Sequence, residues 1–213
     1  MRTKHALLPP LLALLAALCA PGARAADVAG GLKTGLNISD FAGGDAGGDR
    51  SSRAGLQLGG YLIFPVRGSK VRVQTECLYT EKGTIYKGDA PNGHYETRVR
   101  LAYLEFPVLA RFDIESRSGA RPAILLGPAF GIKLSAQAEA HTVGASHSGS
   151  VDNVRAIDPG AVIGGTVDIP AGSGAVTLDA RYTRGLVTVY ESSGGHTPSI
   201  YNSVIALTLG YRF

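Results

Sequence analysis

The sequence is poor in residues that usually fill a large helical core. Tryptophan is absent and methionine occurs once among 213 residues, whereas glycine occurs 29 times. Glycine destabilises helix interiors but permits turns and the close approach of two backbones. This balance argues against a large helical core and favours a chain of short strands and turns, which is an all-β protein.

Cysteine and recognisable ligand-binding motifs are scarce as well. The two cysteines are Cys19 and Cys77, and the first lies in a segment that we expect to be removed. A lone Cys77 would exclude an intrachain disulfide. The sequence contains no phosphate-binding loop, zinc-ligand spacing or nucleotide fingerprint. We therefore expect no cofactor and no metal.

Residues 1–25 are typical of a cleaved signal peptide. A basic start, MRTKH, precedes the apolar run ALLPPLLALLAALCA and the small-residue site Ala23-Arg24-Ala25. The run is shorter than the roughly 20 residues that a spanning helix needs, which disfavours a membrane anchor. Acylation at Cys19 is a second alternative, but the bulky Leu18 precedes it. We predict that the mature chain starts at Ala26 and forms one domain, residues 26–213.

Removal of the signal peptide lowers the net charge of the chain. The 21 basic residues lose three, Arg2, Lys4 and Arg24, and so fall to 18, while the 17 acidic residues all remain. The mature net charge is then +1. The isoelectric point near 9.1 is therefore poor evidence for nucleic-acid binding, and we expect no nucleic-acid partner.

The end of the chain, YNSVIALTLGYRF, has a two-residue period. Ile205, Leu207 and Leu209 share one phase with Tyr211 and Phe213, and the other phase includes Thr208 and Arg212. This period predicts a strand. Since an apolar strand at a terminus of a soluble protein would fray into water, the pattern raises the question of what covers this face.

The same alternation recurs along the mature chain. The segments that show it are residues 28–39, 54–66, 71–82, 95–112, 121–137, 158–169, 175–185 and 201–213. About eight strands result, each long enough to cross a bilayer when tilted. One phase is aliphatic with aromatic residues near the segment ends, and the other carries glycine, hydroxyls and charges. An apolar outside and a polar inside predict an eight-stranded antiparallel up-and-down transmembrane β-barrel, because lipid would then cover the apolar face.

The connections agree with this fold. Long, polar, glycine-rich connections are predicted at residues 40–53, 83–94, 141–157 and 192–200, and shorter ones at 67–70, 113–120 and 170–174. Barrels of the outer membrane place short turns in the periplasm and long loops outside. One strand is irregular, because Val99, Leu101 and Tyr103 oppose the phase of Leu104 and Phe106. We expect a bulge near Tyr103 to correct the phase.

Several motifs resemble the outer-membrane β-barrel proteins of the porin-family or PorT-like type. They are GGLKTGLNISDFAGGD, YLEFPVLARF, LLGPAFGI and the terminal GYRF. The resemblance covers nearly the whole mature chain and implies an eight-stranded barrel in a Gram-negative outer membrane. It also implies that the terminal strand, with Leu209, Tyr211 and Phe213, is read by the barrel-assembly machinery after passage by periplasmic chaperones.

The inward phase collects charges of both signs: Lys33, Arg72, Glu76, Glu105, Arg111, Lys133, Asp168, Asp179, Arg181 and Arg212. One interpretation is a lined channel or a proton path. The other is a network of ion pairs that fills the interior. An eight-stranded barrel leaves little more than side-chain room, and buried charges must be paired. We therefore expect a structural network.

Three further groups are weaker candidates. Ser148 with His141, His147 and Glu139 suggests a hydrolase at the rim that acts on lipid, but the loop lacks a strained nucleophile turn. Asp40, Asp45 and Asp49 would offer carboxylates to calcium, although their spacing matches no EF-hand. Cys77 shares the phase of the lipid-facing residues.

Taken together, the pattern predicts an integral outer-membrane barrel without catalytic activity and with a structural or binding role. We expect its partners to be outer-membrane lipid and lipopolysaccharide and an extracellular ligand bound through the long loops. The alternatives are a rim enzyme resembling lipid A deacylases and a narrow channel for small solutes.

Overall fold

The computed structural model describes residues 28–47, 49–90, 93–117, 119–142, 145–192 and 198–213. The predicted signal peptide, residues 1–25, lies outside them. Within the described ranges the chain forms β1 (Ala29–Ala42), β2 (Asp49–Pro65), β3 (Val71–Ala90), β4 (Gly93–Asp113), β5 (Arg121–Thr142), β6 (Ala145–Ser150), β7 (Ile157–Ala171), β8 (Gly174–Gly185) and β9 (Tyr201–Arg212). None of these residues forms a helix long and apolar enough to cross a membrane.

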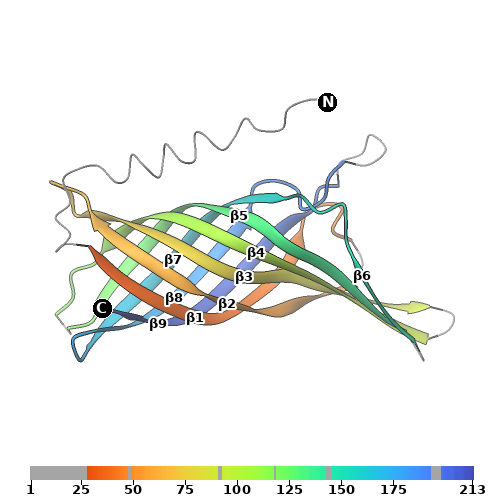
Figure 1. Cartoon of the computed structure of the whole chain (residues 1–213), viewed down its shortest axis with the longest axis horizontal. Coiled ribbons are helices and arrows are strands. Elements are labelled where there is room, and N and C mark those ends of the chain that lie inside the picture. The colour runs from red at the N-terminus through yellow and green to blue at the C-terminus, as the bar shows by residue number, and fades with distance from the viewer. Residues whose placement is uncertain (1–27, 48, 91–92, 118, 143–144, 193–197) are drawn as a thin grey trace.

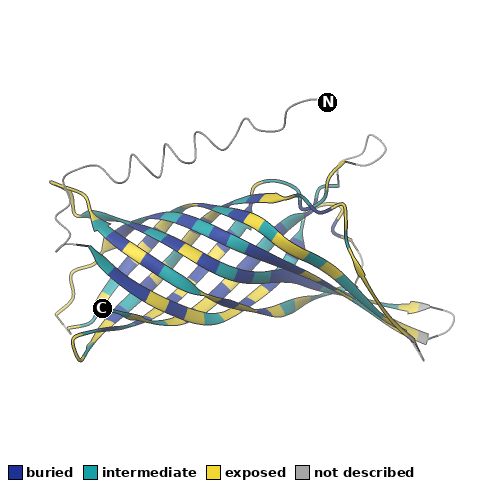
Figure 2. Ribbon diagram, viewed as in Figure 1, coloured by how far each residue is buried: buried dark blue, intermediate teal, exposed yellow. Residues whose placement is uncertain are grey.

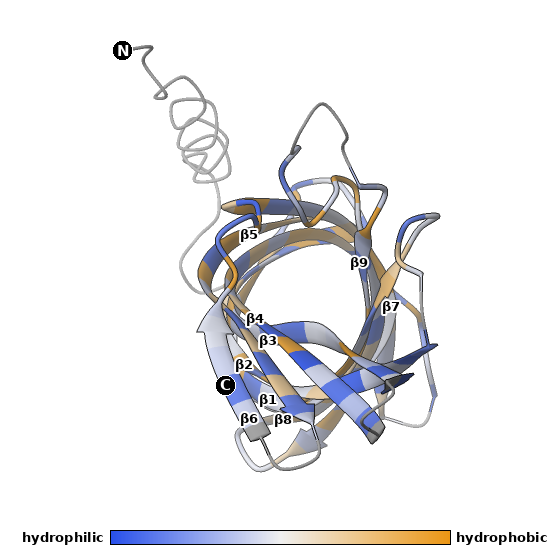
Figure 3. Cartoon of the chain, turned by 90° about the vertical axis from the view of Figure 1, so that its right-hand side faces the viewer, coloured by the Kyte–Doolittle hydropathy of each residue, from blue (hydrophilic) through white to orange (hydrophobic). Residues whose placement is uncertain are grey.

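Eight of the strands close into a barrel, which confirms the predicted fold. Every pairing is antiparallel, and the order is β4-β3-β2-β1-β9-β8-β7-β5, with β4 also paired to β5. The ring is closed between the first and last strands, where Gly31–Ala42 pair with Tyr201–Arg212. The closed wall is visible end-on in Figure 3. Strand β6 pairs with β5 alone among the described residues.

The two-residue period separates the inside of the barrel from its outer face. Leu32 and Leu36 on β1 are 65% and 60% exposed, whereas Lys33 and Asn37 on the same strand are 5% and 0% exposed. Figure 2 shows the resulting checkerboard of buried and exposed residues along the wall. The aliphatic phase therefore faces outward, as predicted for a barrel in lipid.

Inward glycines allow neighbouring strands to approach closely. A β-carbon at Gly35 on β1 would collide with the carbonyl oxygen of Leu207 on β9. By contrast, Gly165 on β7 belongs to the outward phase, and its β-carbon would meet the nearest neighbouring atom at an ordinary contact distance of 3.8 Å. Thus some of the many glycines are required for wall closure, whereas others are not.

The predicted correction in the fourth strand is only partly right. The pairing of β4 with β5 does shift between Ala102 and Tyr103, but the unpaired residue lies on β5, between Lys133 and Ser135. The phase of β4 does not change. Val99, Leu101 and Tyr103 are buried on the inside of the barrel. They point inward because an apolar cluster, described below, receives them.

Three of the predicted long loops are partly wrong, because strands extend into them. Strands β1 and β2 occupy residues 40–42 and 49–53 of the predicted loop 40–53. Strands β3 and β4 continue to Ala90 and Gly93, so residues 83–90 and 93–94 belong to a hairpin, and β6 occupies part of the predicted loop 141–157. Strands β3, β4 and β5 have 20, 21 and 22 residues, against 12 in β8 and 12 in β9. About 9–11 residues cross a bilayer. The surplus forms a sheet that projects from one end of the barrel, at the right in Figure 1.

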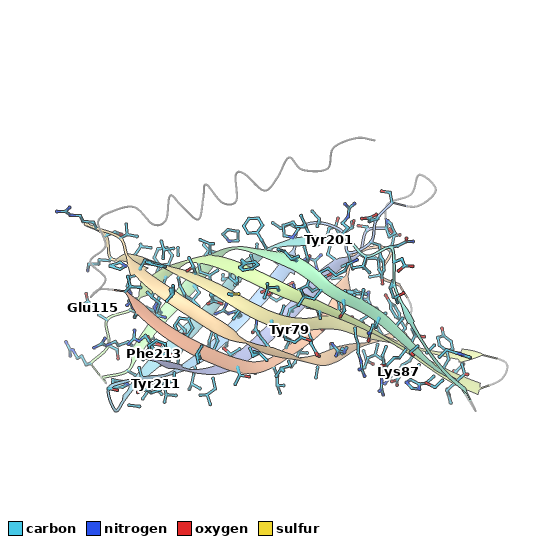
Figure 4. All side chains as sticks on the ribbon, in the orientation of Figure 1. Tyr79, Lys87, Glu115, Tyr201, Tyr211 and Phe213 are labelled. Atoms are coloured by element: carbon cyan, nitrogen blue, oxygen red, sulfur yellow. The ribbon has the colours of Figure 1, made fainter. Side chains whose placement is uncertain are left out.

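The two ends of the barrel differ in the length of their connections. This difference predicts which end faces the periplasm. The C-terminus lies at the end with the short connections, opposite the projecting sheet. Tyr211 and Phe213 lie at this end, with Glu115 on a short connection, whereas Tyr201 and Lys87 lie toward the other end (Figure 4). In outer-membrane barrels the short turns are periplasmic. The projecting sheet is therefore extracellular.

Candidate functional site

The centre of the barrel holds a cluster of four charged side chains. The Lys33 ammonium lies 2.7 Å from a Glu76 carboxylate oxygen, and Arg181 donates two hydrogen bonds to Glu76, at 2.8 and 3.2 Å. Arg181 also forms an ion pair with Asp179. All four side chains are at most 2% exposed. Two cations and two anions thus compensate one another inside the wall.

A second cluster lies toward the periplasmic end. Arg111 donates to Asp168 at 2.7 Å, and Arg212 also contacts this carboxylate, at 3.0 Å. Arg111 further donates to the Gln74 side-chain oxygen at 3.2 Å, and Thr177 donates to Asp168 at 2.9 Å. The carboxylate of Asp168 therefore holds several strands together from the inside.

A third cluster lies on the extracellular side of the centre, and of its charged residues the sequence prediction included only Glu105. Lys82 pairs with Glu105 and with Asp158, the latter at 3.0 Å. Asn202 donates to the same Asp158 at 2.8 Å, and the ammonium of Lys82 lies 5.1 Å from the ring centre of Tyr103. Lys82 and Asp158 share the inward phase of their strands, so extension of the alternation to these residues would have found them.

The structure brings most of the predicted interior residues together, in two of these clusters and part of the third. Lys33, Glu76, Asp179 and Arg181 form the first; Arg111, Asp168 and Arg212 belong to the second; Glu105 belongs to the third. Two do not join them. Arg72 pairs with Asp113 at 2.5 Å at the periplasmic rim, with 27% of its side chain exposed. Lys133 donates to the backbone oxygen of Val154, beside the extracellular end.

An apolar cluster fills the extracellular mouth. Its buried members are Phe41, Ala46, Val99, Leu101, Tyr103, Val154, Val189 and Ile200. Two connections, which follow β6 and β8, supply part of it. They are joined by Arg155 N–H, which donates to Val189 O, and by Glu191 N–H, which donates to Asn153 O, while Val189 N–H donates to Ile200 O within the second connection. We call residues 151–156 and 186–190, with Ser199 and Ile200, the cap.

Tyr190 in the cap is partly buried and packs against this cluster. Its ring packs edge-to-face on Phe41, with ring centres 6.1 Å apart. Burial, and to a lesser degree the neighbouring Tyr86, raises the pKa of Tyr190 to about 12. The mouth of the barrel is thus closed by packed side chains rather than by a solvated loop.

The projecting sheet carries alternating charges on its outer face. One cross-strand row reads Asp49, Lys87, Glu96, His141 and Ser146, from β2 to β6. Arg98 of the next row on this face pairs with Glu96 at 2.6 Å. Neighbouring rows also contain the Arg100–Glu139 pair at 3.2 Å and the His94–Asp89 contact. These side chains are accessible, so this face is a polar surface outside the bilayer.

The hydrolase candidates lie on this sheet but are not assembled as a triad. Ser148 is opposite Glu139, His141 is opposite Ser146, and His147 belongs to the other face because it alternates with Ser148. Within the described residues, no hydrogen bond joins Ser148 to either histidine. Glu139 is instead engaged by Arg100. A nucleophile–base contact, which such catalysis needs, is not formed.

The remaining candidates are separated. Asp40 accepts hydrogen bonds from Phe41 N–H and Thr84, whereas Asp45 accepts one from Ser199 N–H. No group of three His, Cys, Asp or Glu residues in the described part of the chain is placed to hold a metal ion. Cys77 is free and exposed on the outer face of the barrel.

The predicted assembly residues lie on the outer face of the last strand. Leu209, Tyr211 and Phe213 are 54%, 39% and 71% exposed. Phe213 N–H donates to the Gly30 carbonyl at 3.0 Å, which extends the closure of β9 on β1 by one residue. Their recognition by an assembly machinery stays a prediction.

Comparison with known protein families finds a match over most of the chain. A family model described as outer membrane protein beta-barrel domain matches residues 22–191. The chain belongs to this family. It is accordingly an integral outer-membrane β-barrel protein, in agreement with the predicted fold and location.

Solved structures similar to this family member include two outer-membrane barrels. Neisserial surface protein A (NspA) shares 11% identity at a TM-score of 0.47, covering 86% of this chain and 97% of that one. Ail, the attachment invasion locus protein of Yersinia pestis, shares 13% identity at a TM-score of 0.44 in its complex with the heparin analogue sucrose octasulfate, covering 88% and 99%. No curated protein sequence matches the chain.

Proposed function

We propose that this outer-membrane protein is a closed, non-catalytic barrel whose projecting sheet binds another molecule at the cell surface. The observation that carries the proposal is the length of β3, β4 and β5, which continue far beyond the span that a bilayer requires. A barrel with only a structural role in the membrane has no need for this extension. Loops and extensions on a rigid scaffold are the usual place of binding residues.

The interior supports the absence of conduction. Glu76, on β3, and Arg181, on β8, are joined across the lumen, and the apolar cluster with its cap fills the mouth above them. A pore needs a continuous hydrated path, and paired charges with packed apolar side chains leave little room for one. The charges of the polar phase are then structural.

The outer face of the projecting sheet supports binding to a polar or protein ligand rather than to lipid alone. Its ion pairs, such as Arg100–Glu139, are accessible and close to charge balance. Lipid and lipopolysaccharide would surround the aliphatic wall, and the assembly machinery with periplasmic chaperones would act during insertion. No nucleic-acid partner is proposed, because the net charge of the mature chain is nearly neutral.

The test uses a variant that lacks the projecting sheet but retains the barrel. Replacement of residues 86–97 by Asn-Gly joins Ile85 to Arg98, which are paired, and replacement of residues 139–148 by Asn-Gly joins Ala138 to Gly149, which are also paired. Asn-Gly suits two-residue hairpins. Cells that display the full chain or this trimmed chain are compared for adhesion to a panel of immobilised extracellular proteins and glycans.

We expect adhesion with the full chain and its loss with the trimmed chain at equal surface amounts. Heat-dependent gel mobility verifies that both barrels are assembled. Equal adhesion of both chains would overturn the binding role. Steady ion conductance of the purified full chain in a planar bilayer would overturn the closed barrel and favour the channel. Release of fatty acid from lipid A by the full chain, lost on Ser148→Ala, would favour the rim enzyme.

A further inference from the structure

The projecting sheet has an open edge at β6. Strand β5 pairs with β7 along Arg121–Ile132 and then with β6 along Gln137–Thr142. Every barrel strand has a partner on both sides, whereas β6 has a partner only in β5 among the described residues. Residues 146–150 are all exposed. The second side of β6 therefore faces solvent.

The register identifies which backbone groups lie on this open side. Val151 N–H donates to Ala136 O at 3.1 Å, and residues of an antiparallel pair alternate between facing the partner and facing away. His147 and Gly149 consequently face β5, in the same phase as Val151. Ser146, Ser148 and Ser150 direct their backbone N–H and C=O groups away from the sheet.

The edge lacks the usual features that prevent pairing with another strand. Natural edges are commonly blunted by lysine, proline, inward-pointing charges or bulges. The sequence of β6, ASHSGS, contains no proline and no lysine, arginine, aspartate or glutamate. Apart from His147, its side chains are short, so a strand can approach to the normal spacing of about 4.8 Å. Only the shortness of β6 limits such pairing.

We infer that β6 accepts an extended peptide segment of another protein, which adds one strand to the β3-β4-β5-β6 sheet. This inference rests on the proposed binding function and specifies its partner class. The backbone groups of Ser146, Ser148 and Ser150 provide the hydrogen bonds, and the serine side chains set only a loose sequence preference. An extended backbone is the ligand whose donors and acceptors match such a row.

A second copy of this chain is a less suitable occupant. Antiparallel pairing of two identical edges places a two-fold axis perpendicular to the sheet. Because β6 runs with β5 along the barrel (Figure 1), that axis lies in the membrane plane, and the second barrel would be inverted. Such pairing would join only chains on two opposing membranes. A segment of another protein has no such restriction.

The decisive variant is Ser148→Pro. The Ser148 N–H faces away from β5, so proline at this position leaves the β5–β6 hydrogen bonds intact and removes one donor from the open edge. Ser148→Ala is the matched control, because it removes the hydroxyl and keeps the N–H. A random 12-residue peptide library is panned on the full chain in nanodiscs, and the retained peptides are measured on all three proteins.

We expect peptides that bind wild type and Ser148→Ala within about twofold and that bind Ser148→Pro at least tenfold more weakly. N-methylation at alternate positions of a retained peptide should weaken binding similarly. Equal binding to Ser148→Pro, or failure to retain any peptide, would overturn the inference. A wild-type dimer or intercell aggregate that disappears in Ser148→Pro would overturn it in favour of a second copy.

The cell-adhesion assay separates this inference from the proposed function. If the trimmed chain loses adhesion and Ser148→Pro keeps it, the binding role stands and the edge inference fails. If the trimmed chain and Ser148→Pro both adhere like wild type, both fail. Loss in both variants, with Ser148→Ala unaffected, supports the edge as the binding element.

Discussion

Arg181 on β8 reaches across the lumen to Glu76 on β3, with two hydrogen bonds of 2.8 and 3.2 Å. Strands β2, β1 and β9 lie between these two in the sheet. The pair therefore connects opposite parts of the wall rather than neighbours, and it does so at a level where both side chains are buried. Such a crosspiece is incompatible with a wide aqueous lumen at this depth.

The first prediction concerns this crosspiece. Glu76→Ala leaves Lys33 and Arg181 with a single shared carboxylate, Asp179, so one buried cation loses its compensation. We expect a loss of unfolding free energy on the order of 3–5 kcal/mol, measured by denaturant unfolding in detergent. The paired replacement Glu76→Leu with Arg181→Met removes both charges and should cost much less.

A conductance measurement on the same Glu76→Ala variant can contradict this prediction. Screened charges in a water-filled lumen contribute little to stability but govern ion selectivity. A Glu76→Ala barrel with unchanged stability and altered single-channel conductance would contradict the packed interior.

The second prediction concerns pH and the cap. The pKa of Tyr190 is raised to about 12 by burial and by Tyr86, so the folded cap binds this phenolic proton more tightly than an unfolded cap does. The stabilisation is present in full below the ordinary tyrosine pKa of about 10 and is lost as the pH rises toward 12. It amounts to something on the order of 2–3 kcal/mol.

Tyr190→Phe tests this predicted loss of stability at high pH, because the substitution keeps the ring beside Phe41 and removes the titrating group. We expect wild type to lose thermal stability between pH 9 and 11.5 and Tyr190→Phe to lose less. Absorbance at 295 nm should show one tyrosine fewer among those that ionise late. Identical pH profiles for both proteins would indicate that Tyr190 is solvated.

Features that depend on residues close together in the sequence could be predicted, whereas contacts between distant residues could not. The alternation at Leu32, Lys33 and Leu36 is local, and alternation of this kind was sufficient to predict the eight barrel strands, most of their faces and hence the barrel. The contact between Glu76 and Arg181 joins positions 105 apart, and no local pattern specifies which inward charge meets which. The composition of the interior was accessible to prediction, but its pairing was not.

The failures have a physical cause too. Loops are expected where glycine and polar residues gather, yet Gly88 and Ser148 belong to strands, because pairing with the next strand outweighs the weak propensity of such residues. The bulge that we expected near Tyr103 would have placed Val99 and Leu101 on the same face as Leu104. They face inward because loops folded back over the mouth create an apolar interior there, and that depends on Val154 and Val189 far along the chain.

The third prediction concerns closure of the wall. Gly35→Ala forces a methyl group into the Leu207 carbonyl at the junction of β1 and β9. Overpacking of this kind costs about 1–3 kcal/mol, so we expect a lower unfolding midpoint in detergent and slower folding into vesicles. Gly165→Ala is the control, since its new methyl group meets its nearest neighbour at an ordinary contact distance of 3.8 Å. Equal effects of the two substitutions would show that glycine acts through backbone flexibility and not through close approach.

The last prediction concerns the terminal aromatic residue. Phe213 is 71% exposed on the outer face, and its N–H extends the closure onto Gly30. Phe213→Asp would place a carboxylate near the bilayer interface, remove an apolar contact with lipid and alter the strand that we expect the assembly machinery to read. Phe213→Tyr keeps an aromatic ring and is the matched control.

The measurement is the amount of folded protein in the outer membrane, beside spontaneous folding of the purified chain into lipid vesicles. We expect Phe213→Asp to lower the cellular yield severalfold and Phe213→Tyr to change it little. A defect in cells together with normal folding in vesicles would assign the effect to recognition, whereas a defect in both would assign it to lipid contact and closure. An unchanged yield of Phe213→Asp in cells would contradict both roles.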